Sequence, residues 1–328
     1  MRAPLLFTAR TCAPLLLGLA GVFASVEATA QAWPARPVRL IVPFAPGGAA
    51  DLASRIVAER LGATYGQQFI ADNRSGAGGT IGYELLARAA PDGYTLGTAS
   101  DSSTLLPFTY GKLSWDPRSF TGISLLITQP LVLAVHSSVP ATNLKELVAH
   151  ARTVPGKLSF GSSGHGHPQH LAGEMIKLAT GIDMTHIPYK GGGAAIIDLV
   201  GGQIPIVVLG SSPVIPHHRA GKVRILAVIS PTRSNALPDI PTLDEAGVKG
   251  VDLAQWIGMA GPPKLSRDLA KKLSAEVATI LANPATRKTL ESAGFDPSPS
   301  TPEAFEAKMR EEMARWEKLL PKLKIKFD

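Results

Sequence analysis

The chain has 328 residues, with 33 basic and 26 acidic side chains and a formal net charge of +7. The basic residues are spread along the chain, which argues against a nucleic-acid-binding stripe and predicts no nucleic-acid partner. A mild positive excess favours the approach of an anionic solute, although solubility alone would account for it equally well.

The first 32 residues have the pattern of a secretory signal. Arg2 and Arg10 form a positive start, and the apolar run 13–24 is too short to span a bilayer; A-x-A cleavage sites follow it. We expect cleavage near Ala32 and a periplasmic mature protein; a retained membrane anchor is the disfavoured alternative. The single cysteine, Cys12, lies in the removed segment, so no disulfide is expected.

The organising stretch of the mature chain lies near its start. Residues 38–42 form an apolar, β-branched run typical of a buried strand. A Gly- and Pro-rich turn at 43–50 ends it, and a helical apolar stripe begins at Asp51. This unit brings free backbone N–H groups and the positive end of a helix dipole to one point. It therefore predicts a general anion-binding device.

Two more strands, at 68–71 and 94–99, end in polar or Gly-rich loops at 72–79 and 100–103. In a parallel α/β sheet the carboxyl ends of the strands meet at one edge, where ligands bind. We therefore expect these loops to lie near the first turn.

The middle of the chain repeats this alternation. Strands are expected at 131–135, 158–160, 184–189, 204–209 and 223–229, and helices at 143–152, 169–180, 194–200 and 213–220. The last third differs: a strand is expected at 251–259, followed by helices at 266–281, 284–293 and 302–320. The alternation predicts an α/β fold with mainly parallel sheets and flanking helices.

Two motifs suggest catalysis or a cofactor and fail on spacing. The glycines after Ser75 do not complete G-x-G-x-x-G, because position 81 is Ile, so we expect no cofactor. Ser162 and Ser163 lie in a Gly-rich loop that does not satisfy the nucleophile elbow G-x-S-x-G. We expect no catalytic residue and no enzyme activity; helix capping and ligand hydrogen bonding explain the serines better.

Three histidines, His165, His167 and His170, raise the question of a metal. Their spacing is not H-E-x-x-H, and the nearest following carboxylate is Glu174, so we expect no metal. His165 is instead expected to donate a hydrogen bond near a ligand cleft, which would make affinity depend on pH.

Several long segments resemble the Bug (Bordetella uptake gene) family, the periplasmic solute-binding receptors of tripartite tricarboxylate transporters. They are PVRLIVPFAPGGAADLASRIVAERL, DNRSGAGGTIGYELLARAAPDGYTL, GSSGHGHPQHLAGEMIKLATGIDMTHIPYKGGGAAIIDLVGGQI, GKVRILAVIS and LPDIPTLDEAG. The resemblance runs from Trp33 almost to the C-terminus. The chain departs from the family's usual residues at Leu106, Pro205, His165 and His167.

The resemblance implies a two-lobed, type II periplasmic-binding-protein fold with a ligand cleft between the lobes. It implies capture of a small carboxylate-bearing anion, without chemistry, for delivery to membrane permease subunits. The expected division is a signal peptide at 1–32, one lobe at 33–126, a second lobe at 127–228, a return to the first lobe at 229–265 and packing helices at 266–328. We expect a monomer.

The resemblance carries over loops 44–51 and 75–79 as one jaw and loops 161–166 and 189–192 as the other; the remaining candidates come from other polar loops. The complete expected ligand-binding set is Phe44, Ala45, Gly47, Gly48, Ala49, Asp51, Ser75, Gly76, Ala77, Gly78, Ser100, Ser102, Ser103, Ser162, Ser163, Gly164, His165, Tyr189, Lys190, Gly191, Gly210 and Ser211. Within it, Asp51 is expected to hold its loop. Ser100, Ser102 and Ser103 are expected either to cap a helix or to contact the ligand, and Lys190 either to pair with a distal carboxylate or to lie at the surface.

Two other functions stay open at this point. One is an exported esterase that uses Ser163 with a histidine. The other is a liganded receptor that docks on a sensor domain and signals. The sequence does not name the solute, because the loops that would choose it are those where the chain departs from the family pattern.

Overall fold

The computed structural model describes residues 33–323 and 325. The expected signal peptide, its cleavage site and Cys12 lie outside the described residues. Residues from Pro34 onward belong to one compact unit. Within the described part of the chain, no helix combines the length and apolarity needed to cross a membrane.

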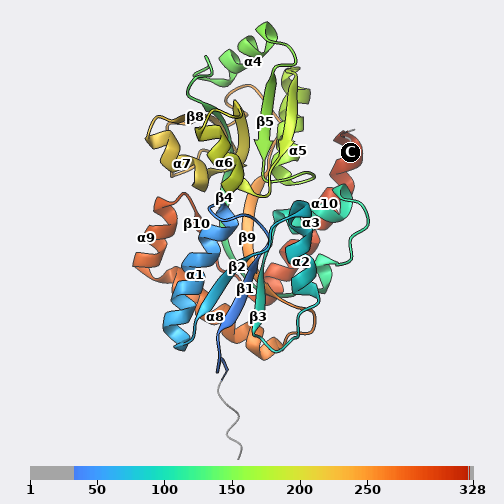
Figure 1. Cartoon of the computed structure of the whole chain (residues 1–328), viewed down its shortest axis with the longest axis vertical. Helices are drawn as coiled ribbons and strands as arrows, with labels where there is room; N and C mark the ends of the chain where they lie inside the picture. Colours follow the sequence, from blue (N-terminus) through green and yellow to red (C-terminus); the bar gives the residue numbers. More distant parts are fainter. Residues whose placement is uncertain (1–32, 324, 326–328) are drawn as a thin grey trace, which may run out of the picture. The chain divides into compact units, whose positions relative to one another are not determined.

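The first sheet is built around three parallel strands (Figure 1). They are β1 (Val38–Val42), β2 (Phe69–Asn73) and β3 (Thr95–Ser100). β9 (Ala254–Gly261) joins β3 antiparallel, and the first part of β4 (Thr121–His136) joins β9. The short β10 (Asp296–Pro297) pairs with β4. Helices α1 (Ala49–Tyr65), α2 (Thr80–Ala87) and α3 (Asp101–Thr109) follow the three parallel strands.

The second sheet has the same plan. β5 (Leu158–Ser162) is parallel to β6 (Met184–Pro188) and β7 (Ile206–Gly210). The second part of β4 lies antiparallel between β7 and β8 (Val223–Ile229). Helices α5 (Pro168–Thr180), α6 (Gly192–Val200) and α7 (Ser211–Arg219) follow β5, β6 and β7, and α4 (Leu144–Thr153) precedes β5.

β4 connects the two sheets as one long strand. Its residues 121–130 pair with β9, and its residues 131–136 pair with β7 and β8. The expected α/β class is confirmed, and both sheets are mixed, because β4 and β9 add antiparallel neighbours to the parallel strands.

The two sheets repeat one local design, down to the backbone angles of their helix caps. Gly66 ends α1 at φ 66° and ψ 17°, and Gly181 ends α5 at φ 68° and ψ 16°. Gly76 precedes the short 3-10 helix Ala77–Gly79 that leads into α2, and its φ is 133° and its ψ 156°. Gly191 before α6 has similar angles, with φ 122° and ψ 160°. Only glycine adopts such angles at little cost, which explains why both halves have glycine there. Each half therefore presents its helix starts at the carboxyl ends of its parallel strands.

The last three helices are α8 (Arg267–Ala282), α9 (Pro284–Ser292) and α10 (Pro302–Leu323). The buried residues of α10 recur at helical spacing, as Phe305, Met309, Met313 and Trp316. Phe305 contacts Trp256 of β9 edge to face, with ring centroids 5.5 Å apart, whereas Trp316 belongs to the core that includes the second sheet. α10 thus packs against elements of both sheets.

One segment differs from its expected structure. The sequence predicts a polar loop at 100–103, whereas Asp101, Ser102 and Ser103 form the first turn of α3. The N–H of Ser100 donates to the hydroxyl of Ser103 at 3.4 Å, which satisfies a backbone group at the start of this short helix. Pro107 lies inside this helix and has no N–H to donate to the carbonyl of Ser103, and the helix ends two residues later at Thr109.

Candidate functional site

A small buried cavity lies where loops and helix starts from both sheets meet. Its volume is about 20 Å³, with room for about one water molecule. The lining residues are Phe44, Gly48, Ala49, Ala50, Ser102, Ser163, Gly192, Gly210, Pro213 and Gln255.

The first turns of four helices line this cavity. Ala49 and Ala50 begin α1, Ser102 lies in the first turn of α3, Gly192 begins α6, and Pro213 lies in the first turn of α7. The first N–H groups of a helix have no partner inside it, and the helix dipole is positive there. Four such ends at one point form a concentrated anion-binding environment.

None of the ten lining residues is charged. The polar side chains among them are the hydroxyls of Ser102 and Ser163 and the amide of Gln255. Such neutral groups and backbone N–H donors bind a carboxylate reversibly through charge-assisted hydrogen bonds. None of the lining residues carries a negative charge, so no side chain of the wall would repel an anion.

Asp51 holds the loop after β1 in place. Its carboxylate accepts hydrogen bonds from the N–H of Gly47 at 2.9 Å, from Arg55 at 2.9 Å and from the amide of Asn73 at 2.9 Å. Burial alone would raise the pKa of Asp51, but the hydrogen bonds from Arg55, Gly47 and Asn73 outweigh it and lower the pKa. Gly47 has a φ of +81°, which favours glycine.

The loop after β1 touches the loop before α6 through backbone atoms. The N–H of Ala45 donates to the carbonyl of Lys190 at 2.8 Å. A Cβ on Gly48 would lie 3.2 Å from the nitrogen of Gly193, and a Cβ on Gly193 would lie 1.9 Å from the carbonyl oxygen of Pro46. Glycine is therefore required at 193 for the loops to approach this closely, and a larger residue at 48 would crowd the contact.

Two further hydrogen bonds join residues of the two halves. Thr109 at the end of α3 donates to the carbonyl of Gly166 at 2.8 Å. Nε2 of His167 donates to the carbonyl of Gly78 at 2.9 Å, and its ring meets Phe44 edge to face at 5.6 Å. His167 is fully buried, and burial lowers its pKa to about 4.

The structure brings six of the expected site residues to the cavity wall: Phe44, Gly48, Ala49, Ser102, Ser163 and Gly210. The other sixteen are Ala45, Gly47, Asp51, Ser75, Gly76, Ala77, Gly78, Ser100, Ser103, Ser162, Gly164, His165, Tyr189, Lys190, Gly191 and Ser211. Most of them lie in the same loops as the lining residues, and several hold the backbone of those loops through hydrogen bonds.

Several of these sixteen side chains have structural partners instead. Tyr189 donates to Asp198 at 2.7 Å, and burial together with Asp198 raises its pKa. Ser211 donates to Gln129 at 3.3 Å. Ser100 and Ser103 were expected either to cap a helix or to contact the ligand, and in the structure they form the cap of α3. Lys190 has an exposed side chain.

Sequence reasoning missed two lining residues, Pro213 and Gln255; Ala50 and Gly192 lie within loops that it expected. Gln255 pairs with Gln129 across β9 and β4, and its Oε1 accepts from Nε2 of Gln129 at 2.5 Å. Its place in the site depends on this long-range pairing, for which the local sequence has no signal.

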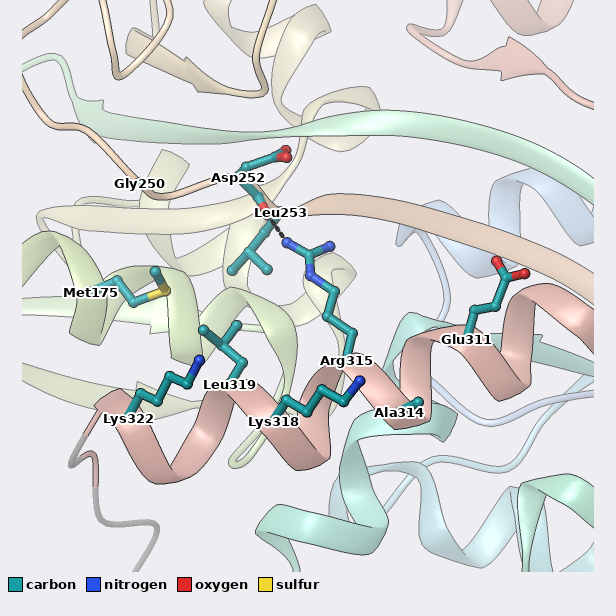
Figure 2. A pocket seen from close by; sticks show the side chains of 10 residues that line it. All are labelled: Met175, Gly250, Asp252, Leu253, Glu311, Ala314, Arg315, Lys318, Leu319 and Lys322. Carbon is teal, nitrogen blue, oxygen red and sulfur yellow. Dashed lines mark hydrogen bonds between the residues drawn. The ribbon is translucent and has the colours of Figure 1, made fainter.

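A larger surface groove, of about 550 Å³, lies elsewhere, along α10 (Figure 2). It is lined by Met175, Gly250, Asp252, Leu253, Glu311, Ala314, Arg315, Lys318, Leu319 and Lys322. The Arg315 guanidinium points to the Asp252 carbonyl and donates to it at 2.6 Å. No helix start lies among these residues, and Lys322 in the last turn complements the negative end of the α10 dipole. The small cavity is therefore the candidate anion site.

Comparison with known proteins identifies the family of the chain. Residues 53–325 match the family model described as tripartite tricarboxylate transporter family receptor. The protein BugT of Bordetella pertussis is 32% identical over 308 residues, covering 92% of this chain and 93% of BugT. A Pseudomonas protein described as UPF0065 protein in the tcbD-tcbE intergenic region is 33% identical over 316 residues, 95% of this chain and 94% of its own.

Solved structures show the same fold. One described as a periplasmic transporter superposes with a TM-score of 0.87 at 38% identity, covering 90% of this chain and 100% of its own. Rpa4515 of R. palustris, solved with adipate, gives 0.85 at 33% identity, covering 89% and 98%. MatC of Rhodopseudomonas palustris, solved with bound malate, gives 0.82 at 29% identity, covering 87% and 99%.

The resemblance inferred from the sequence is thereby confirmed, as is the periplasmic-binding-protein fold. Members of this family are solute-binding receptors of the periplasm and not enzymes, which removes the esterase alternative. The chain belongs to the Bug family of tripartite tricarboxylate transporter receptors.

Proposed function

We propose that this chain captures a small organic carboxylate in the periplasm and delivers it to the membrane permease subunits of a tripartite tricarboxylate-type transporter. The observation that carries the proposal is the meeting of four helix starts at one cavity with no charged lining residue. A carboxylate placed there would accept hydrogen bonds from N–H and hydroxyl groups of both halves of the molecule. Binding would therefore favour the approach of the two halves. The adipate and malate bound by two similar proteins are consistent with this ligand class.

Binding on this proposal requires the two halves to part and close again. The cavity holds about one water molecule, so an organic anion needs the contact between Ala45 and Lys190 to open. We propose lobes at 33–126 and 127–228 with a return at 229–265, and β4, which pairs in both sheets, as a hinge strand. The closed form is then the state that the permease reads.

The mature protein is proposed to begin after cleavage near Ala32 and to act as a monomer. Signalling through a sensor domain is the second candidate, and the same cleft would serve it. Recovery of a sensor domain rather than permease subunits with the liganded protein would favour signalling.

A thermal-shift screen of the purified protein tests carboxylate binding directly. A ligand that binds only the folded protein raises the apparent melting temperature, and a ligand at about 100 times its Kd adds about 2.7 kcal/mol. We expect at least one aliphatic mono- or dicarboxylate, with adipate and malate among the first to test, to raise it in a concentration-dependent way. An unchanged melting temperature across mono-, di- and tricarboxylates, amino acids and aromatic acids would contradict the proposal.

A further inference from the structure

Three histidines from separate elements meet behind the loop that carries Ser163. They are His165 in that loop, His170 near the start of α5 and His186 in β6. One ring nitrogen from each lies within 4.8 Å of the other two. His170 is 5% exposed, and the other two are half-buried. The sequence offered His165, His167 and His170 as neighbours; in the fold His186 takes the place of His167.

His170 and His186 are kept neutral by their surroundings. Burial, and next the repulsion from neighbouring histidines, lower the pKa of His170 to about 2 and that of His186 to about 3. A neutral imidazole can coordinate a metal ion without first losing a proton, once the hydrogen bond to its acceptor nitrogen is replaced. The nitrogen atoms of all three rings lie close enough together to reach one ion, and His170 and His186 hold no proton that would repel it.

Hydrogen bonds around the cluster orient its rings. Ser162 donates to the carbonyl of Gly164 at 3.0 Å, so its oxygen accepts from Nε2–H of His186 at 2.7 Å, leaving Nδ1 of His186 as the lone-pair atom. Nδ1 of His170 accepts from the N–H of Gly166 at 3.2 Å, and its Nε2 lies 4.0 Å from the carboxylate of Glu174, so a bound ion has to replace the hydrogen bond from Gly166. Hydroxyl and carboxylate partners behind imidazole rings are the usual second layer of a histidine metal site.

The present ring arrangement also defines what must change on binding. The rings of His170 and His186 are stacked, with centroids 3.6 Å apart and an interplanar angle of 9°. Lone pairs in two parallel planes do not converge on one ion. A bound ion therefore requires one ring to rotate out of the stack, bringing the nitrogens to about 2.0–2.1 Å from the metal.

We propose that His165, His170 and His186 form a binding site for a divalent transition-metal ion of the zinc type, with three imidazole ligands and an open position. The ion would tie the loop 161–167 to α5 and β6. Because that loop carries Ser163, occupancy would stiffen one wall of the anion cavity. The metal site does not depend on the identity of the solute.

Isothermal titration of the purified protein with zinc chloride, in a non-coordinating buffer, tests the site. We expect one saturable zinc ion per chain. His170→Gln and His186→Gln should each weaken binding at least tenfold, because each removes a ligand. His217→Gln, on α7 and outside the cluster, is the matched control and should bind as the original chain does. Absence of saturable binding, or equal weakening in the control, would overturn the proposal.

X-ray absorption on the zinc-loaded original chain gives a second test that requires no variant to fold. We expect a first shell with about three imidazole nitrogens at about 2.0–2.1 Å. A shell of oxygen atoms with one imidazole or none would show that the ion binds elsewhere, and the site would be rejected.

Discussion

The N–H of Ala45 in the loop after β1 donates to the carbonyl of Lys190 in the loop before α6, at 2.8 Å. This bond joins the two repeated halves beside the cavity, and it uses no side-chain chemistry. Close backbone approach is what makes glycine necessary in these loops. The site is therefore sensitive to added side-chain volume.

Gly48→Val tests that sensitivity. The backbone of Gly48 is extended (φ −82°, ψ 171°), which valine adopts readily, but a Cβ there would lie 3.2 Å from the nitrogen of Gly193. We expect the variant to fold with a nearly unchanged melting temperature. Its affinity for any carboxylate found in the screen should fall at least tenfold, because the loops can no longer close.

Gly111→Val is the matched control for this change. A Cβ on Gly111 meets no atom within 4 Å, and its φ lies outside the left-handed region. Calorimetric titration should give the original affinity for Gly111→Val and a weakened one for Gly48→Val. Equal affinities in the two variants would remove the loop after β1 from the site.

Gln255→Glu tests the lining residue that the sequence did not reveal. A glutamate oxygen can still accept from Gln129, so the contact between β4 and β9 is kept. The added charge would repel a bound carboxylate by about 3 kcal/mol at a separation of about 5 Å and an effective dielectric constant of about 20. We expect carboxylate affinity to fall about a hundredfold at neutral pH.

The control for charge alone is Gln68→Glu, at an exposed glutamine just before β2. It changes the net charge equally and leaves the cavity untouched. If both glutamates weaken binding to the same extent, the effect is long-range and Gln255 does not face the ligand.

The contrast between Gly48 and Gln255 shows how far local sequence reaches. Gly48 lies in a strand–turn–helix unit, and such a unit is defined by residues adjacent in the chain, so its role was readable. Gln255 reaches the cavity only because β9 pairs with β3 and β4, and His186 meets His170 only because β6 pairs with β5. Pairing between distant segments is set by the whole core, and no local pattern encodes it.

Local sequence is equally limited in assigning a role to a polar side chain from its residue type alone. Ser100 and Ser102 are two positions apart, yet Ser100 sits at the α3 cap whereas Ser102 lines the cavity. The sequence left both roles open because the start of α3 was not recognised. Once the helix begins at Asp101, its geometry alone separates the two.

Asp51→Asn tests the support of the loop after β1. The variant loses the carboxylate charge that accepts hydrogen bonds from Gly47, Arg55 and Asn73. A hydrogen bond to a charged group contributes about 1.5–3 kcal/mol to the free energy of unfolding. We expect the free energy of unfolding to fall by about 2 kcal/mol at pH 7. Urea denaturation measures it.

The pH dependence of that difference has a definite sign. The folded-state pKa of Asp51 is lowered, so its contribution is present above the unfolded value of about 3.9 and is lost as the pH falls through the lower folded value. The two chains should begin to converge in stability as the pH falls below about 4, and they should meet once the pH is below the folded pKa of Asp51. A difference that persists unchanged in acid would mean that the carboxylate charge is not what holds the loop.

His167→Gln addresses the buried contact with Gly78. Glutamine retains an N–H donor for the carbonyl of Gly78, but it does not titrate. The pKa of His167 is about 4 in the folded protein, against about 6.5 when unfolded, because burial disfavours the charged ring. Between these values the unfolded chain binds a proton that the folded protein does not. The contribution of His167 is thus complete above about pH 6.5 and declines as the pH falls towards 4.

Urea denaturation at a series of pH values measures this effect. Within that window each such histidine adds a slope of up to about 1.4 kcal/mol per pH unit. We expect His167→Gln to remove about one such increment between about pH 6 and pH 5, while His170 and His186 keep theirs. Above about pH 7.5 the two chains should differ by a constant amount, since His167 is neutral in both states. Parallel stability profiles across the whole range would show that His167 is not titrating from a buried, neutral state, and that acidification acts on the closed halves through other groups.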